Sequence, residues 1–142
     1  MADWQRYGKH ILATFWQCQC DERLLTNYAM LSQQLIQATQ TVGLTIVGQC
    51  GYEFADSLMP LPEPICPNIA QQGSGVTLTL LLAESHLCLH TWGEYRSVTL
   101  DIYVCNVSND NSHKADNLLK FCQDLFLPAS FDSQSIWRKH QP

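Results

Sequence analysis

Three apolar runs of β type follow one another closely in the second half of the chain, at Val76–Leu82, Leu87–Trp92 and Ser97–Val104. The segments between them are only a few residues long, and the one around Gly93 has the composition of a turn. Strands that are joined this closely pair with one another as antiparallel neighbours. The chain is therefore predicted to fold around a three-stranded meander.

Further strands and two helices are predicted on either side of the meander. The expected elements are a strand at Gly8–Cys18, a helix from a cap at Asp21 to Gly43, a strand at Leu44–Cys50, a helix from a cap at Ser112 to Pro128, and an edge strand at Ser130–Lys139. Apolar residues recur every three or four positions in both helices, which gives each helix one apolar face. These patterns predict an α+β fold, a two-layer sandwich in which two helices cover one face of a largely antiparallel sheet.

Length, charge and cysteine content narrow the class of protein. The 142 residues, 46% of them hydrophobic, fit a single domain over residues 1–142. The chain has eight basic and thirteen acidic residues, and the basic residues form no cluster, which argues against nucleic acid as a partner. No apolar run reaches the roughly 20 residues of a membrane span, and the seven cysteines form no paired motif. We therefore expect a cytoplasmic protein with reduced thiols and no membrane partner.

A serine flanked by an acid and an imidazole interrupts the apolar meander at Glu84-Ser85-His86. Strand alternation places His86, Cys88 and His90 on one face, a set that could bind zinc with Cys105. Alternate strand positions lie about 6 to 7 Å apart, however, which is too far for three of them to share one ion comfortably. A Ser/His hydrolase is a second alternative, but no Gly-x-Ser-x-Gly elbow surrounds Ser85. The remaining alternative is a purely structural role.

A longer motif around this serine resembles a known family. Residues 82–95 (LAESHLCLHTWGEY) and 101–105 (DIYVC) are similar to the core of the prokaryotic S-adenosylmethionine decarboxylases. These are small pyruvoyl enzymes of polyamine and spermidine biosynthesis. Residues 8–10 (GKH) and 75–77 (GVT) also resemble the family, and the similarity covers most of residues 7 to 126.

The resemblance implies that the chain is a zymogen that cuts itself between Glu84 and Ser85. The Ser85 hydroxyl attacks the Glu84 carbonyl, and elimination from the resulting ester leaves a β chain (1–84) and an α chain (85–142). Ser85 becomes the pyruvoyl cofactor, whose ketone forms a Schiff base with the substrate amine. His90 is implied as the proton acceptor of this processing. Thr77 supports processing with a hydroxyl where the family has serine.

The resemblance also assigns residues to turnover. Cys105 matches the proton donor, and a thiol with a pKa of about 8.5 is largely protonated at neutral pH, as a general acid must be. Glu94 matches a substrate-binding carboxylate, and His86 is expected to support processing. The resemblance implies no metal, a small amino-acid-type substrate, and a homodimer of cleaved protomers with active sites between subunits.

The chain departs from the family in the segment that recognises adenine. The usual His-x-Phe-x-Pro-x-Gly segment is replaced by residues 69–74 (IAQQGS), and Gly93 stands where proline is usual. A proline-rich loop is expected over residues 56–74. Aromatic and acidic residues in and beside this loop offer either a replacement for the adenine platform or partners for a basic head group: Tyr52, Glu53, Phe54, Asp56 and Glu63. S-adenosylmethionine is the preferred substrate, arginine or ornithine the alternative, and a non-catalytic partner subunit a weaker one.

Overall fold

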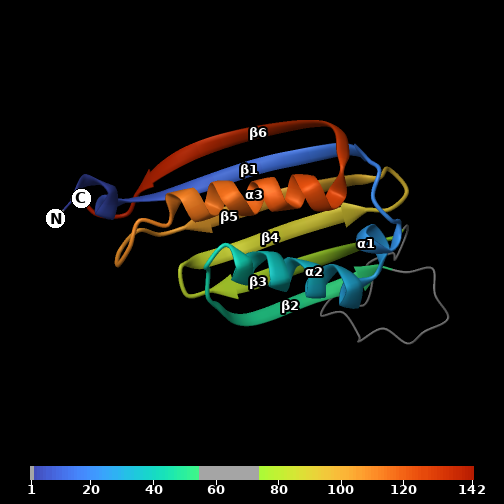
Figure 1. Ribbon diagram of the computed structural model, residues 1–142, viewed down its shortest axis with the longest axis horizontal. Helices are drawn as coiled ribbons and strands as arrows, with labels where there is room; N and C mark the ends of the chain where they lie inside the picture. Colours follow the sequence, from blue (N-terminus) through green and yellow to red (C-terminus); the bar gives the residue numbers. More distant parts are fainter. Residues whose placement is uncertain (1, 55–73) are drawn as a thin grey trace, which may run out of the picture.

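The computed structural model describes residues 2–54 and 74–142, which form one six-stranded antiparallel sheet with helices on one side (Figure 1). The strand order is β2-β3-β4-β5-β1-β6. The strands are β1 Tyr7–Cys18, β2 Ile46–Phe54, β3 Gly75–Leu82, β4 Ser85–Trp92, β5 Ser97–Val104 and β6 Pro128–Lys139. The helices are a short 3-10 turn at Asp3–Arg6, α1 Arg23–Thr26, α2 Tyr28–Thr41 and α3 Ser112–Phe126. Apart from Ser74, the predicted loop at 56–74 lies outside the described residues.

The predicted meander is confirmed as β3, β4 and β5 at the centre of the sheet. A two-residue turn at Ala83 and Glu84 joins β3 to β4, because Leu82 pairs with Ser85. Trp92 pairs with Ser97 at the start of β5. The first strand, β1, lies between β5 and the C-terminal strand β6, so the two ends of the chain lie side by side in the sheet.

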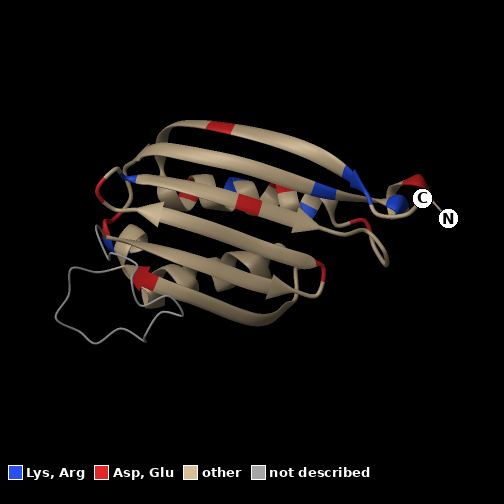
Figure 2. Ribbon diagram, turned by 180° about the vertical axis from the view of Figure 1, so that it is seen from behind, with Lys and Arg blue, Asp and Glu red and all other residues tan. Residues whose placement is uncertain are grey.

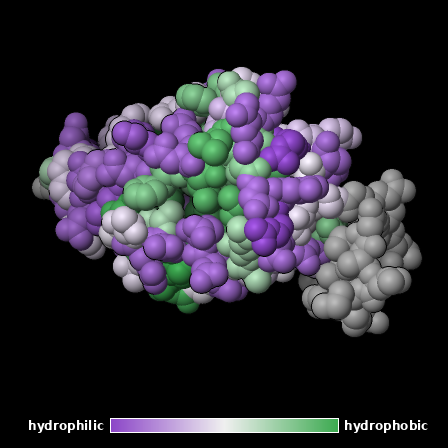
Figure 3. Space-filling view, turned by 45° about the vertical axis from the view of Figure 1, so that its right-hand side comes forward, coloured by the Kyte–Doolittle hydropathy of each residue, from purple (hydrophilic) through white to green (hydrophobic). Residues whose placement is uncertain are grey.

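The core lies between the sheet and the helices. Alternate residues of the strands point to the helices and are buried, as period-two patterning requires; the largest include Phe15, Leu78, Leu80, Leu89 and Ile102. They pack against buried side chains of α2 and α3, among them Leu31, Leu35, Leu118 and Phe126. The expected two-layer α+β sandwich is therefore confirmed. An oblique view of the molecule shows hydrophobic surface at its centre, among hydrophilic side chains (Figure 3).

The Asp21 carboxylate accepts the Arg23 N–H at 3.0 Å, at the helix start where the cap was predicted. The two helices differ from the prediction in a break in the first and in the cap of the second. The first helical segment breaks into α1 and α2 because Asn27 adopts an extended conformation, and its side chain accepts a hydrogen bond from the Met30 N–H at 2.8 Å. Asn27 thus caps α2 in the middle of the apolar stripe. Ser112 does not cap α3 but is its first residue, and its N–H donates to the Asp110 carboxylate at 3.1 Å. In the described part of the chain, no helix combines the length and apolarity needed to span a bilayer.

The second strand runs four residues further than predicted. Tyr52 and Phe54, which the sequence assigned to the loop region, pair with Thr77 and Gly75 of β3. Gly51 does not end the strand, because the ring of Tyr28 packs over it and a β-carbon there would lie 2.1 Å from the ring. The aromatic residues therefore belong to the sheet.

No element of the described chain covers the other side of the sheet, which we call the open face. Figure 2 looks onto this face and shows few charged positions on the strands. It carries the imidazoles of β4 and also several large apolar side chains that are 37 to 47% exposed: Leu12, Trp16, Leu81, Trp92 and Ile136. An antiparallel sheet can leave one face in water, but large apolar side chains on such a face favour a further contact.

Candidate active site

The β3–β4 turn holds Ser85 in an unusual backbone conformation. Its φ is +148°, whereas the other positive-φ residues among those described with a side chain, such as Gln17 and Arg96, have φ near +50°. A φ of this kind is easy for glycine only, and other residues adopt it at a cost of about 1–3 kcal/mol. The structure therefore places backbone strain at the peptide bond that the sequence predicts to be cut.

The carbonyl before Ser85 is fixed from the neighbouring strand. The Cys105 N–H donates to the Glu84 carbonyl oxygen at 2.7 Å, directly after β5 ends. The Thr45 N–H donates to a Glu84 carboxylate oxygen at 3.0 Å, and the Ala83 N–H donates to the Thr45 carbonyl at 2.8 Å. An N–H that already points at a carbonyl oxygen can stabilise the negative charge that develops there when the carbonyl is attacked.

Asparagines downstream hold the Cys105 backbone in place. The Asn111 side-chain amide donates to the Cys105 carbonyl at 2.9 Å, and the Asn111 N–H donates to the Asn106 side-chain oxygen at 2.7 Å. Cys105 itself is half-buried beside the turn. By contrast, burial raises the pKa of the Cys18 thiol to about 11 and that of Cys122 to about 12, so these core thiols stay protonated and inert.

A second group of predicted residues lies at the other end of β4. The Thr77 hydroxyl lies 3.0 Å from Nδ1 of His90, its cross-strand partner, and a Glu94 carboxylate oxygen accepts the Ser74 N–H at 3.2 Å. The three predicted side chains line one cavity of about 200 Å³, together with two aromatic side chains from β2 and β4. The lining residues are Phe54, Ser74, Gly75, Thr77, His90, Thr91, Trp92 and Glu94.

The surroundings of Gly93 show why glycine stands at this position, where proline is usual in the family. Its N–H donates to the Ser74 carbonyl at 2.8 Å, a bond that proline cannot make. A β-carbon at Gly93 would also lie 2.6 Å from the Ser74 hydroxyl oxygen. The glycine therefore lets the turn after β4 close against Ser74, next to Glu94.

The two groups are far apart within one chain. Ser85 and His90 are five residues apart on β4, and at about 3.3 Å per residue this separates them by about 16 Å. His90 is therefore too far away to act as the base for Ser85 of the same chain, and the other base of the hydrolase alternative, His86, has Asp101 as its partner. Ser85, Glu84 and Cys105 lie together in one group, and Thr77, His90 and Glu94 lie together in the other.

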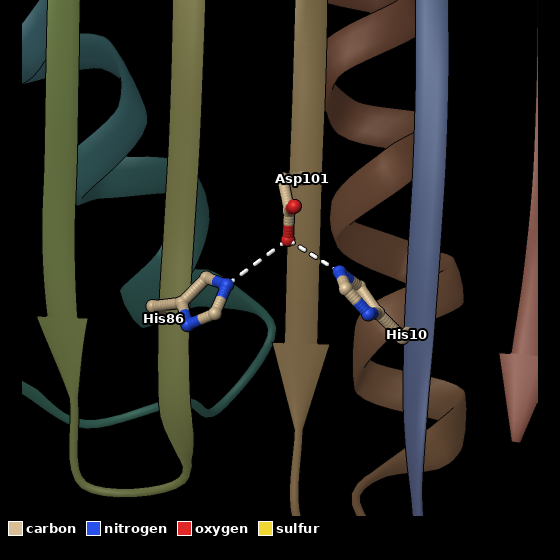
Figure 4. Close-up of side chains that lie close together, drawn as sticks. All are labelled: His10, His86 and Asp101. Atoms are coloured by element: carbon tan, nitrogen blue, oxygen red, sulfur yellow. Dashed lines mark hydrogen bonds and ion pairs between the residues drawn. The ribbon is translucent and has the colours of Figure 1, made fainter. Parts of the chain in front are cut away.

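His86 takes part in a third arrangement, on the open face. One Asp101 carboxylate oxygen lies 2.9 Å from Nε2 of His86 and 2.6 Å from Nε2 of His10, so a single oxygen bridges two imidazoles (Figure 4). Among the described residues, these are the His, Cys and acidic side chains close enough together to hold one metal ion. The alternative zinc set does not form, since His86 turns to Asp101 and Cys88 accepts the Thr79 hydroxyl instead.

Comparison with known proteins decides between the alternatives. The sequence profile of the S-adenosylmethionine decarboxylase family matches residues 9–139. The chain belongs to this family. It is 29% identical over 131 residues to an S-adenosylmethionine decarboxylase proenzyme of Methanococcus aeolicus, covering 92% of both chains. It is 30% identical to one of Thermotoga petrophila, over 80% of this chain and 72% of that protein. The crystal structure of the adenosylmethionine decarboxylase from Aquifex aeolicus superposes with a TM-score of 0.73, at 25% identity over 97% of this chain and 95% of that one.

Within this decarboxylase family fold, two residues of the site escaped the sequence reasoning. Asp101 is the single charged residue of β5 and lies in an apolar strand, which is a signal that could have been noticed. His10 follows Gly8 and Lys9 in a segment that resembled the family without a role for the histidine. Their contact with His86 depends on the pairing of β1 with β5 and β5 with β4.

Proposed function

We propose that the chain is a self-cleaving, pyruvoyl-dependent S-adenosylmethionine decarboxylase, cut between Glu84 and Ser85 into a β chain (1–84) and an α chain (85–142). The observation that carries this proposal is the strained Ser85 backbone, whose preceding carbonyl already accepts the Cys105 N–H at 2.7 Å. Family membership supports the substrate and the reaction class.

The first step of cleavage moves an acyl group from nitrogen to oxygen. The Ser85 hydroxyl oxygen attacks the Glu84 carbonyl carbon, an ester bond forms, the peptide C–N bond breaks, and the hydroxyl proton ends on the Ser85 nitrogen. The Cys105 N–H stabilises the negative charge on the carbonyl oxygen. Breaking the peptide bond also relieves the strain at Ser85, so the energy stored in the fold favours this step.

The second step requires a base that takes the α-proton of Ser85. The ester C–O bond then breaks, and Glu84 leaves as a carboxylate. Water then hydrolyses the C–N bond at the new N-terminus, which releases ammonia and leaves a keto group. His90 is the assigned base, with Thr77 holding its Nδ1 at 3.0 Å. The same chain holds His90 about 16 Å away from Ser85.

A homodimer removes this difficulty. A two-fold axis lying between two open faces and perpendicular to β4 reverses the strand, so the Ser85 end of one chain faces the His90 end of its partner. The exposed apolar side chains of the open face, such as Leu81 and Trp92, support burial in such a contact. Each active site then combines Ser85 and Cys105 of one protomer with Thr77, His90 and Glu94 of the other.

Turnover uses the residues that remain after cleavage. The pyruvoyl group supplies an electron sink for the electrons released as CO₂ leaves the amine substrate. Ser85 fits as the source of this group, because it is only half-buried and because the Cys105 N–H holds the carbonyl of the peptide bond before it. Cys105 donates a proton to the carbon that has lost CO₂.

Recognition of the substrate falls to the cavity at the other end of β4. Glu94 accepts hydrogen bonds from ribose hydroxyls, since the Ser74 N–H already orients its carboxylate. Phe54 and Trp92 line the same cavity and offer the aromatic faces on which adenine stacks, in place of the missing phenylalanine. The arginine or ornithine alternative gains no support: Glu53 instead accepts the Tyr28 N–H at 2.8 Å, and Asp56 and Glu63 lie outside the described residues. Free thiols in the described part of the chain support a cytoplasmic location.

Mass spectrometry and CO₂ release test this proposal together. The purified wild-type protein should contain two fragments that divide between Glu84 and Ser85, the second with a blocked N-terminus. It should release CO₂ from S-adenosylmethionine and not from arginine, ornithine or lysine. Ser85→Ala should remain one chain without activity, whereas Ser133→Ala, a serine on the exposed strand β6, should behave as wild type. An active wild-type protein with an intact chain would reject the proposal.

A further inference from the structure

We propose that Asp101 and His10 are positioning residues for self-cleavage: with His86 they form a bridge across three strands that holds Ser85 in its strained conformation. The inference rests on the proposed function and deepens it. It concerns the formation of the ester, the step that depends most on the backbone conformation at the Glu84–Ser85 peptide bond.

The bridge links the three neighbouring strands β4, β5 and β1. It joins the two histidines to Asp101, which lies two residues before their backbone partner on β5. His86 and His10 are both backbone partners of Tyr103, yet both side chains turn along the strands to Asp101 (Figure 4). One carboxylate oxygen accepts from both Nε2 atoms, at 2.9 and 2.6 Å. Both imidazoles therefore carry a hydrogen on Nε2, and bonds to a carboxylate are the stronger kind of hydrogen bond.

Tyr103 keeps the two imidazoles turned toward Asp101. Its ring lies over Gly8, where a β-carbon would come within 2.4 Å of the ring, and the Arg138 guanidinium lies 5.0 Å from the ring centre. The ring centre of Tyr103 is 5.4 Å from that of His10 and 6.0 Å from that of His86. Packing therefore fills the side of the imidazoles that faces away from the carboxylate.

The bridge acts on the residue that follows the scissile bond. Upstream of the bond, Thr45 holds Ala83 and Glu84, and Cys105 holds the Glu84 carbonyl. Downstream, His86 is the first side chain with a fixed partner, and that partner is Asp101. Relaxing φ of Ser85 toward an ordinary strand value would rotate the peptide plane that leads into His86. A bridge that fixes His86 to β5 and β1 opposes this rotation and keeps the strain on the bond.

A pulse-labelled time course measures the role directly. The full chain is made in cell-free synthesis with a pulse of labelled methionine; all three methionines lie in residues 1–84, so the label follows the intact chain and the β chain. Asp101→Asn and His10→Ala should each slow cleavage by about tenfold. His10→Gln should stay within about twofold of wild type, because its amide nitrogen still donates. Asp124→Asn removes an exposed carboxylate from α3, on the helix side of the sheet, and should change nothing.

Two further arms separate positioning from other roles. Neutral hydroxylamine cleaves esters but not peptide bonds, so it should not accelerate Asp101→Asn, whose slow step precedes the ester. A chelator should leave wild-type cleavage unchanged, because the bridge is a hydrogen-bonded one.

Several results would overturn the proposal. They are wild-type cleavage kinetics in Asp101→Asn, a His10→Gln variant as slow as His10→Ala, rescue of Asp101→Asn by hydroxylamine, or a chelator-sensitive wild type, which would assign the cluster to a metal ion. If wild type itself is never cleaved, the proposed function fails and this inference fails with it. A wild type that is cleaved, beside an unaffected Asp101→Asn, removes the positioning role alone.

Discussion

The two ends of strand β4 differ in which part of the chain carries their distinctive features. At the Ser85 end the chemistry lies in the backbone: a strained φ of +148° and a carbonyl held by the Cys105 N–H. At the His90 end it lies in side chains that surround a cavity and are fixed by Thr77 and Ser74. In the proposed function, the Ser85 end starts the cleavage, and the His90 end completes it and binds the substrate. Neither end is a complete site, and variants that damage one end at a time should show this.

The largest effect is expected at the His90 end. His90→Ala removes the base, so cleavage should slow by about 10² to 10⁴ fold, the range that a general base contributes. The Ser85 end remains intact and still forms the ester, which accumulates. Neutral hydroxylamine should therefore cut His90→Ala chains after Glu84 but leave Ser85→Ala chains whole. A His90→Ala chain that is resistant to hydroxylamine would show that His90 acts before the ester forms.

Cys105→Ala should separate the role of the Cys105 backbone in cleavage from the role of its thiol in turnover. The backbone N–H that donates to Glu84 is retained, so cleavage should stay within about threefold of wild type. The thiol is lost, so kcat of the cleaved enzyme should fall by about 10² fold. Gel analysis of cleavage and CO₂ release from S-adenosylmethionine measure the two effects separately. Equal losses in both would contradict this division of roles.

Gly93→Ala should produce the smallest effect and confine it to the cavity. The new β-carbon would lie 2.6 Å from the Ser74 hydroxyl oxygen and 2.7 Å from a methyl group of Thr26, so the turn beside Glu94 must shift. KM for S-adenosylmethionine should rise by about tenfold, equivalent to one lost hydrogen bond of roughly 1.4 kcal/mol, while cleavage continues. A control substitution far from the cavity is Ser133→Ala, on the edge strand β6, which should leave KM unaltered. Slower cleavage together with an unchanged KM of the cleaved enzyme would contradict the assignment.

The fold followed from the sequence because period-two patterning marks buried strands clearly. The meander, the first strand and the edge strand were predicted with their ends close to the observed ones. The break at Asn27 was missed because an apolar stripe runs through it, and only the local cap reveals it. Tyr52 and Phe54 were placed in or beside the loop because the predicted strand ended at Cys50, whereas β2 continues through Gly51, over which the ring of Tyr28 packs.

The residues proposed for the site came from the sequence, but their arrangement did not. Ser85, His90 and Cys105 were found through resemblance to the family, and their roles remain proposals. The distance between Ser85 and His90 was already implied by their spacing on one strand, although the structure was needed to place Cys105 beside Glu84. The bridge of His10, Asp101 and His86 depends on strand register across 91 residues of sequence, which patterning does not determine.

Mixed dimers test the central claim, that one active site is built from the two ends of two different chains. Ser85→Ala and His90→Ala chains with different tags are co-expressed, and dimers carrying both tags are purified. Each such dimer contains one site that joins an intact Ser85 to an intact His90 of the partner subunit. The account predicts that the His90→Ala chain is cut in the mixed dimer and remains whole when it is expressed alone. A His90→Ala chain that stays uncut in the mixed dimer would contradict it.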